Sequence, residues 1–261
     1  MGERGVRMKF LDLFAGIGGF RMGLESLGHE CVGFCEIDKF ARKSYKAIYD
    51  TEGEIELHDI TEVTNEEWRK LRGTVDIICG GFPCQAFSIA GKREGFLDET
   101  RGTLFFEIAR SAKEIKPPLL FLENVKGLLS HDKGRTFRTI LSTFDELGYD
   151  AEWQVLNSKD FGVPQNRERV FIIGHLRGTS GRGRVGKQVA NTLLTSGNQG
   201  VVTENLKIRK LTPRECWRLQ GFPDWAFDKA QEVNSKTQLY KQAGNSVTVN
   251  VIKAIAERLE Q

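Results

Sequence analysis

The sequence predicts an α/β fold with a doubly wound sheet and helices on both of its faces. Short apolar runs alternate with helical patterns along the 261 residues, the order that gives parallel strands covered by helices. The first apolar run is followed by a glycine-rich turn, 15–19, and then by a helical pattern, as in sheets that bind nucleotides.

The first two strands are predicted at 8–14 and 31–36, with a helix between them that Gly28 ends. Glu36 closes the second strand, where a carboxylate can accept hydrogen bonds from both hydroxyls of a ribose. A solvated charge at a strand end is the alternative for this residue. Asp38 then caps the next helix.

A short third strand at 55–58 precedes Asp59 and Ile60. By position, the acid can take the exocyclic amine of an adenine, and the isoleucine can pack on the ring. An aspartate in a simple turn explains the pattern equally well, because aspartate is common in turns.

The fourth strand, 75–79, is the one around which the chain is organised. Gly80 and Gly81 end it, and Pro83 stiffens the loop that presents Cys84 beyond the carboxyl end of the strand. In open α/β sheets, ligands and catalytic groups collect at that edge. Cys84 lies among turn residues, so its sulfur is a candidate nucleophile. Most free cysteines are inert and buried, as we expect for Cys31, Cys35, Cys79 and Cys216.

A polar, glycine-rich loop follows at 85–103, and its basic residues beside a candidate nucleophile indicate a lid over a phosphate-bearing substrate. A helix at 104–115 and a fifth strand at 119–122 come next, with Glu123 at the carboxyl end of that strand. Cys84 and Glu123 thus end two strands that can be neighbours, which predicts a catalytic pair.

Strands at 151–156 and 170–173 complete the sheet. Arg167 and Arg169 share strand parity, so both can face one side. The alternative is an exposed ion pair with the glutamate between them.

The composition changes after the last strand. Residues 175–187 contain four glycines, four Arg or Lys residues and no acid, which suits a nucleic-acid backbone but cannot form a core. A helix at 211–220 has a capping box of Thr212 and Glu215. Residues 242–247 are predicted to open a last helix, which continues to Leu259.

Composition bounds the class of protein. The net charge of +3 is too small to establish a nucleic-acid partner, and the five cysteines show neither a C-x-x-C pair nor a zinc pattern. They indicate reduced thiols in a cytosol and no metal site. No apolar run has the length of a membrane span, and the N-terminus lacks a signal-peptide core. We therefore expect an intracellular protein that does not enter a membrane.

Motifs along nearly the whole chain resemble those of the DNA (cytosine-5) methyltransferases, and they occur in family order. The matching segments are 12–19 (DLFAGIGG, cofactor loop), 81–85 (GFPCQ, nucleophile), 123–125 (ENV, acid), 165–169 (QNRER, paired arginines), 214–216 with 218–223, and 244–247 (GNSV). The resemblance implies a mostly parallel, seven-stranded, Rossmann-like methyltransferase sheet.

The resemblance also implies S-adenosylmethionine as methyl donor, S-adenosylhomocysteine as product, and no metal. The implied donor-binding residues are Phe14, Ala15, Gly16, Ile17, Gly18, Gly19, Glu36, Ile37, Asp59, Ile60, Pro83, Leu104, Asn245 and Val247. Cys84 would add to C6 of a flipped-out cytosine, which makes C5 nucleophilic. A protonated Glu123 would bind N3, while Arg169, and Arg167 with it, would contact the base O2 or hold Glu123. The expected contacts to double-stranded DNA are Gln85, Ser88, Lys92, Arg93, Arg101, Arg182 and Arg184.

The chain departs from the family in the interval 175–208, between the implied donor-binding domain, 1–174, and the segment 209–261 that returns to it. Family members carry a target-recognition segment there, and this interval is too short for an independent core. We favour a minimal methyltransferase with relaxed specificity, because every catalytic motif is intact.

Three alternatives remain open. The chain borrows recognition from a partner chain or a second copy, or it binds cofactor and nucleic acid without turnover, or it methylates RNA. The last is disfavoured because the tripeptide Cys-Phe-Thr of the tRNA-directed branch is absent. The resemblance implies a bacterial or phage-type protein of the cytoplasm, associated with the nucleoid, in a restriction-modification or an orphan role.

Overall fold

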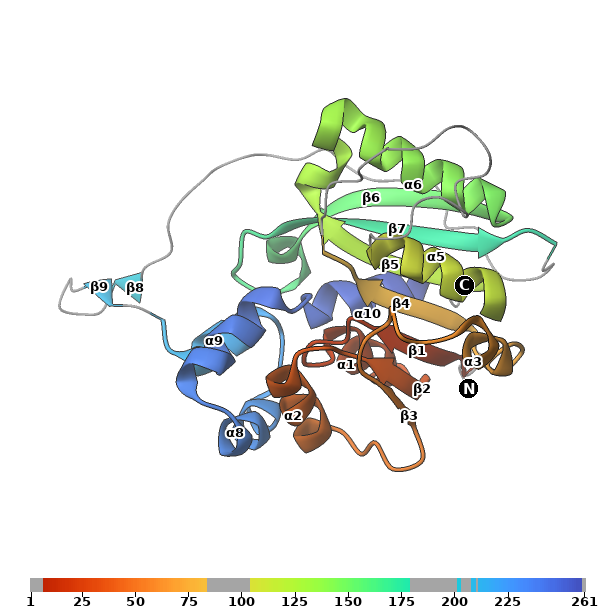
Figure 1. The fold of residues 1–261 in the computed structure, drawn as a ribbon. Coiled ribbons are helices and arrows are strands. Elements are labelled where there is room, and N and C mark those ends of the chain that lie inside the picture. The colour runs from red at the N-terminus through yellow and green to blue at the C-terminus, as the bar shows by residue number, and fades with distance from the viewer. Residues whose placement is uncertain (1–6, 84–103, 179–200, 203–207, 210, 260–261) are drawn as a thin grey trace, which may run out of the picture.

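The computed structural model describes residues 7–83, 104–178, 201–202, 208–209 and 211–259. These residues contain a seven-stranded sheet with the order β3-β2-β1-β4-β5-β7-β6 (Figure 1). Its strands are β1 (Lys9–Leu13), β2 (Glu30–Cys35), β3 (Ile55–Leu57), β4 (Ile77–Gly81), β5 (Leu119–Val125), β6 (Tyr149–Asn157) and β7 (Glu168–Leu176). Strands β1 to β5 pair in parallel, whereas β7 is antiparallel to both of its neighbours. The expected mostly parallel sheet is confirmed.

The helices of the described residues alternate with these strands and then follow them. They are α1 (Gly19–Glu25), α2 (Lys39–Ile48), α3 (Asn65–Lys70), α5 (Leu104–Ile115), α6 (Arg135–Glu146), α7 (Pro213–Leu219), α8 (Asp224–Val233), α9 (Lys236–Asn245) and α10 (Val249–Leu259). Three short 3-10 helices are η1 (Lys126–Leu129), η2 (His131–Gly134) and η3 (Ser158–Phe161). A separate antiparallel pair consists of β8 (Val201–Val202) and β9 (Ile208–Arg209).

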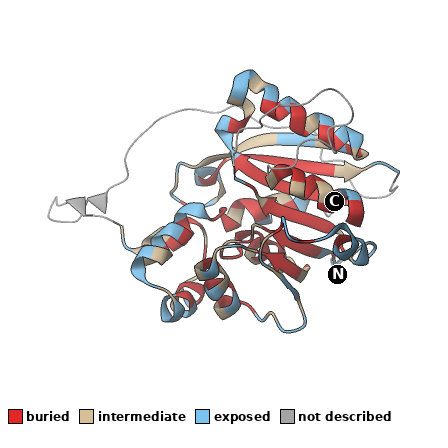
Figure 2. Ribbon diagram, viewed as in Figure 1, coloured by how far each residue is buried: buried red, intermediate tan, exposed pale blue. Residues whose placement is uncertain are grey.

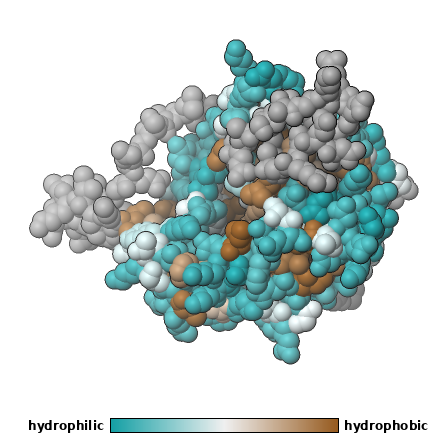
Figure 3. Space-filling model, viewed as in Figure 1, coloured by the Kyte–Doolittle hydropathy of each residue, from teal (hydrophilic) through white to brown (hydrophobic). Residues whose placement is uncertain are grey.

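Helices cover both faces of the sheet because successive strand residues point to opposite sides. Leu11 and Leu13 of β1 belong to a core cluster with α3, α5 and α6, whereas Phe10 of the same strand packs with α1 and α10. The central strands are buried along most of their length (Figure 2). On the outside, hydrophilic side chains dominate the visible face, with hydrophobic ones gathered near its middle (Figure 3).

A third core cluster joins the C-terminal helices to the N-terminal half of the sheet. Trp217 of α7 is fully buried, and its indole N–H donates to the Leu239 carbonyl oxygen in α9 at 3.0 Å. Tyr45 and Ile48 of α2 belong to the same cluster. This packing brings α9 to the edge of the sheet where β2 ends.

The fourth strand was predicted at 75–79, but β4 begins at Ile77 and includes both glycines, with Gly81 as its last residue. Gly80 pairs with Leu13 on one side and Leu122 on the other. A Cβ atom on Gly80 would lie 2.4 Å from the Leu13 carbonyl oxygen, so the glycine permits a close approach of two strands. Likewise β5 includes Glu123, which was expected just beyond the strand.

The last helix also begins later than predicted. Residues 242–245 are the final turn of α9. The helix ends there, with Ser246 as its C-cap, and α10 starts at Val249. Helices α3, α8 and α9 were not predicted, and β7 continues to Leu176, past the expected domain boundary at 174. Of the cysteines expected to be buried, Cys216 is half-buried, whereas the other three are buried.

Candidate functional site

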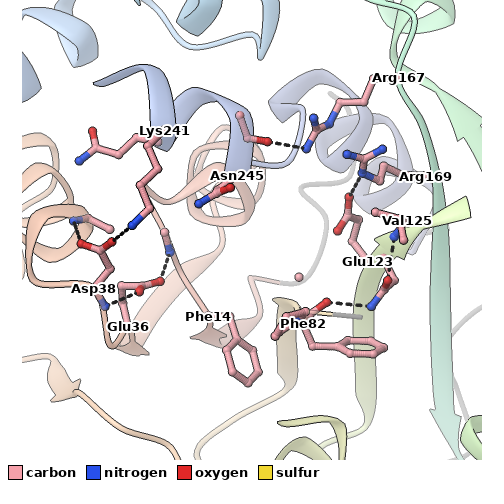
Figure 4. Close-up of a pocket in the computed structure, with 17 residues that line it drawn as sticks. Phe14, Glu36, Asp38, Phe82, Glu123, Val125, Arg167, Arg169, Lys241 and Asn245 are labelled. Carbon is pink, nitrogen blue, oxygen red and sulfur yellow. Dashed lines mark hydrogen bonds and ion pairs between the residues drawn. The ribbon is translucent and has the colours of Figure 1, made fainter. Parts of the chain in front are cut away.

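A pocket of about 430 Å³ lies where the carboxyl ends of β4 and β5 face the end of α9 (Figure 4). The structure brings together at its wall a large part of the predicted site. The predicted donor-binding residues in the lining are Phe14, Gly16, Glu36, Pro83 and Asn245. The predicted catalytic residues in the lining are Glu123, Arg167 and Arg169. In Figure 4, Glu36 and Glu123 lie on opposite sides, with Asn245 between them.

One side of the pocket is organised by the carboxylate of Glu36. Its two oxygens accept hydrogen bonds from the backbone N–H groups of Gly16, at 2.8 Å, and Asp38, at 2.7 Å. Burial raises the pKa of Glu36, and the two backbone hydrogen bonds oppose that rise. Arg42 donates to the carbonyl oxygens of Glu36 and Ile37. The carboxylate is therefore held in one orientation before any ligand arrives.

Helix α9 closes this side through residues that the sequence analysis did not identify. Lys241 Nζ lies 2.6 Å from Asp38 Oδ2, while the other oxygen of Asp38 caps α2, as predicted. Gln242 donates to the Phe40 carbonyl oxygen at 3.1 Å. Both contacts join segments about two hundred positions apart, and no local pattern in the sequence marks them.

The opposite side holds the predicted acid. Glu123 pairs in register with Gly81, which confirms that β4 and β5 are neighbours, and Arg169 Nε lies 3.0 Å from Glu123 Oε1. Burial raises the pKa of Glu123, although the charges of Arg169 and Arg167 act to lower it. A Cβ on Gly81 would lie 3.1 Å from Glu123 Oε2, so a glycine here leaves room for the carboxyl group.

The backbone that leads to Cys84 is held by a residue with no predicted role of its own. The Asn124 side chain, which is 2% exposed, donates to the Phe82 carbonyl oxygen at 2.7 Å. Cys84 lies outside the described residues, as do the predicted lid, 85–103, and the expected DNA contacts Gln85, Ser88, Lys92, Arg93, Arg101, Arg182 and Arg184.

Arg167 and Arg169 both line the pocket, but they do different things. Arg169 contacts Glu123, whereas Arg167 Nη2 donates to the carbonyl oxygens of Ser246, at 2.9 Å, and Gly244, at 3.2 Å. Burial lowers the pKa of Arg167 to about 10. Arg167 therefore holds the break between α9 and α10, and with it the position of Asn245.

The other predicted donor-binding residues do not line the pocket. Val247 lies behind it, where a Cβ on Gly19 would come within 2.7 Å of its side chain and a Cβ on Gly81 within 3.5 Å. Ile37 is 67% exposed, and Ile60 is buried in the core. Asp59 accepts hydrogen bonds from Thr61. The remaining ones are Ala15, Ile17, Gly18, Gly19 and Leu104. The roles expected for all of these residues stay predictions.

Two further observations concern the described ranges only. They contain no group of three or more His, Cys, Asp or Glu side chains that could hold a metal ion. None of their helices is both long enough and apolar enough to cross a membrane.

The chemistry of the pocket differs between its two sides. The oriented carboxylate of Glu36 suits a ligand with neighbouring hydroxyl groups. The ion pair of the buried Glu123 with the half-buried Arg169 suits a planar, polar ring that offers both an acceptor and a protonatable nitrogen. The pocket therefore presents two chemically different walls to whatever it binds.

Comparison with known proteins gives a consistent result. The profile of the family described as C-5 cytosine-specific DNA methylase matches residues 8–192 and 177–261. The type II methyltransferase M1.ScrFI of Lactococcus lactis subsp. cremoris is 40% identical over 316 residues, covering 97% of this chain and 78% of the relative. M.HhaI of Haemophilus parahaemolyticus is 38% identical over 317 residues, covering 95% of this chain and 93% of the relative.

The alignments also show that these relatives contain residues that this chain lacks. Both alignments are longer than the chain itself, so each relative has residues without a counterpart here. The two ranges matched by the family profile overlap at 177–192. This overlap lies inside the interval 175–208, where a shortened target-recognition segment was predicted. A crystal structure of a Spodoptera frugiperda DNMT2 mutant shares the fold, with a TM-score of 0.72 and 18% identity over 97% of this chain and 100% of the other.

Proposed function

This chain belongs to the C-5 cytosine-specific DNA methylase family and methylates cytosine C5 in DNA, and we propose how its own residues carry out that transfer. The observation that carries the proposal is the two-sided pocket. The chemistry of one side suits a nucleoside and that of the other suits a base, and Asn245 lies between them.

We assign the side of Glu36 to the methyl donor, S-adenosylmethionine. When bound, the donor supplies a methyl group on a sulfonium centre and leaves as S-adenosylhomocysteine. The Glu36 carboxylate would accept hydrogen bonds from the two ribose hydroxyls, since the backbone N–H groups of Gly16 and Asp38 already set its orientation. Phe14, Pro83 and Asn245 would form the neighbouring walls. A volume of about 430 Å³ is in the range of small-molecule sites.

The side of Glu123 would receive the flipped cytosine. The raised pKa of Glu123 favours its protonated form, which can donate to N3 of the ring. Cys84 follows Gly81 by three positions, and Gly81 pairs with Glu123. Its thiolate would form a bond to C6 while N3 takes the proton of Glu123. The ring then becomes an enamine with a nucleophilic C5. Once C5 carries the methyl group, a base would remove the C5 proton, and the C5–C6 double bond would re-form as the Cys84 sulfur leaves C6. N3 would return its proton to Glu123, which restores the ring and the acid.

The reduced interval, 175–208, supports a second element of the proposal. Relaxed sequence specificity is expected if the basic residues there contact only the DNA backbone, because phosphate contacts carry no sequence information. A recognition partner or a second copy of the chain would restore specificity. A DNA substrate and bacterial relatives support a cytoplasmic location, at the nucleoid.

The test is transfer of a labelled methyl group from S-adenosylmethionine to mixed-sequence duplex DNA, with single-stranded DNA and tRNA as parallel substrates. We expect 5-methylcytosine in the duplex from the wild type, and loss of transfer in Cys84→Ser with donor binding retained. Cys216→Ser is the matched control, since that thiol lies in α7, away from the pocket lining. Turnover by Cys84→Ser at the wild-type rate would rule out the covalent route. Methylation of tRNA with none of either DNA would show that the substrate is RNA and would contradict the proposal.

A further inference from the structure

The glycine-rich turn before α1 has an unusual backbone that needs support from outside. Phe14, Gly16 and Gly18 all have positive φ, at 54°, 57° and 79°, and a non-glycine residue in that region is strained. Part of the support comes from β2, whose Cys35 carbonyl oxygen accepts from the Ala15 N–H at 3.0 Å, and from the Glu36 carboxylate.

The rest of the support comes from beneath the turn, from Tyr49 at the end of α2. Its hydroxyl donates to the Gly18 carbonyl oxygen at 2.7 Å, with the Ile17 carbonyl oxygen at 3.3 Å. The ring is 7% exposed, and a Cβ on Gly18 would lie 2.4 Å from its Cε2 atom. A side chain at position 18 would therefore have to displace the ring.

Tyr49 is itself held in place by a buried arginine. The guanidinium carbon of Arg21 lies 4.5 Å from the centre of the Tyr49 ring. Arg21 is 3% exposed, and its nitrogens lie 2.8 Å from both carboxylate oxygens of Glu54 and 2.9 Å from the Asp50 carbonyl oxygen. The tyrosine ring is thus fixed between an anchored cation and the turn.

Tyr45, which lies one helical turn earlier, has a different role. Its ring stacks on Phe34 at 4.3 Å, and its hydroxyl contacts Asp12, Arg21 and Cys31, not the glycine turn. Of these two buried tyrosines, one inside α2 and one at its C-cap, only Tyr49 therefore donates a hydrogen bond to the turn.

We infer that Tyr49 is a positioning residue for the methyl donor, acting through the turn without touching the ligand. Its hydroxyl holds the Ile17–Gly18 carbonyl groups, and this keeps the N–H of Gly16 and the wall formed by Phe14 and Gly16 in the binding conformation. The inference rests on the proposed donor site at Glu36, and it extends that site to a residue that does not line the pocket.

The test compares Tyr49→Phe with the control variant Tyr45→Phe. Each variant removes one buried tyrosine hydroxyl, from the C-cap of α2 or from inside the helix. Calorimetry should show the dissociation constant of S-adenosylmethionine raised about two- to tenfold in Tyr49→Phe, the effect of one ordinary hydrogen bond, and nearly unchanged in Tyr45→Phe. In steady-state assays the KM for the donor should rise by the same factor, with kcat and the KM for DNA unchanged. Amide hydrogen exchange at 15–19 should accelerate only in Tyr49→Phe, which gives a readout independent of activity.

The outcomes separate this inference from the function on which it rests. Equal donor affinity in the two variants, or equal exchange at 15–19, would overturn the role of Tyr49 while leaving the donor site intact. A wild-type protein that does not bind S-adenosylmethionine would overturn both.

Discussion

Removing the carboxylate of Glu36 is the sharpest test of where the methyl donor binds. In Glu36→Ala the donor loses its acceptor for two ribose hydroxyls, and the backbone N–H groups of Gly16 and Asp38 lose the oxygens that they contact at 2.8 and 2.7 Å. The first loss weakens binding directly. The second releases the glycine turn, so both act in the same direction.

The size of the effect follows from the charge on the acceptor. A hydrogen bond to a charged group contributes about 1.5–3 kcal/mol. In the variant, water would replace the carboxylate as acceptor and restore part of the lost binding free energy. For two ribose hydroxyls we expect a net loss of about 3 kcal/mol, which raises the dissociation constant roughly a hundredfold.

Isothermal titration of S-adenosylmethionine and S-adenosylhomocysteine into both proteins measures this directly. Glu30→Ala is the matched control, because Glu30 is a carboxylate at the start of β2, whereas Glu36 directly follows the end of that strand. Glu30 pairs with Arg7 at 3.1 Å. Its affinity should stay within about twofold of the wild type, since this surface ion pair is remote from the pocket. A Glu36→Ala protein that is folded and binds the donor as tightly as the wild type would refute the ribose assignment.

Two further predictions concern the pH dependence of activity and the stability of the fold. If protonated Glu123 is required, kcat/KM falls as the pH rises through the pKa of Glu123. Removing the Arg169 charge that lowers this pKa should move the fall to higher pH in Arg169→Met but not in Arg169→Lys, and coincident pH–rate profiles would contradict this. Thr212→Ala should lower the free energy of unfolding by about 1 kcal/mol, because the capping box with Glu215 is present. Urea titration against Thr212→Ser, which keeps the hydroxyl, measures that loss, and equal midpoints would count against the cap.

Two features of the sequence predicted which residues meet on the Glu123 side of the pocket: local patterns, and the rule that parallel strands end at one edge of the sheet. Glu123 was expected beside the strand that leads to Cys84, because parallel strands end at the same edge of a sheet. The register of Gly81 with Glu123 confirms that the strands are neighbours. Strand parity likewise predicted that Arg167 and Arg169 face one side, and both line the pocket.

The same patterns did not predict the break between α9 and α10. Apolar residues continue at helical spacing from Ala243 to Leu259, so the sequence favours one helix. The structure interrupts it at Ser246, where the carbonyl oxygens of Gly244 and Ser246 accept from Arg167. The side chain of Arg167, from the loop just before β7, thus satisfies carbonyl groups that a continuous helix would have used.

By itself, the sequence determined the family, the order of the strands along the chain and the residue types at their ends, because these depend on local composition and spacing. The tertiary structure alone decided which distant groups support them: Lys241 on Asp38, Arg167 on the break before α10, and Tyr49 beneath the glycine turn. Each of these contacts joins separate elements, and its energy comes from burial and from satisfying a backbone or charged group. The spacing of apolar residues along the sequence does not predict such a contact, since the two partners meet only once the sheet and its helices have packed.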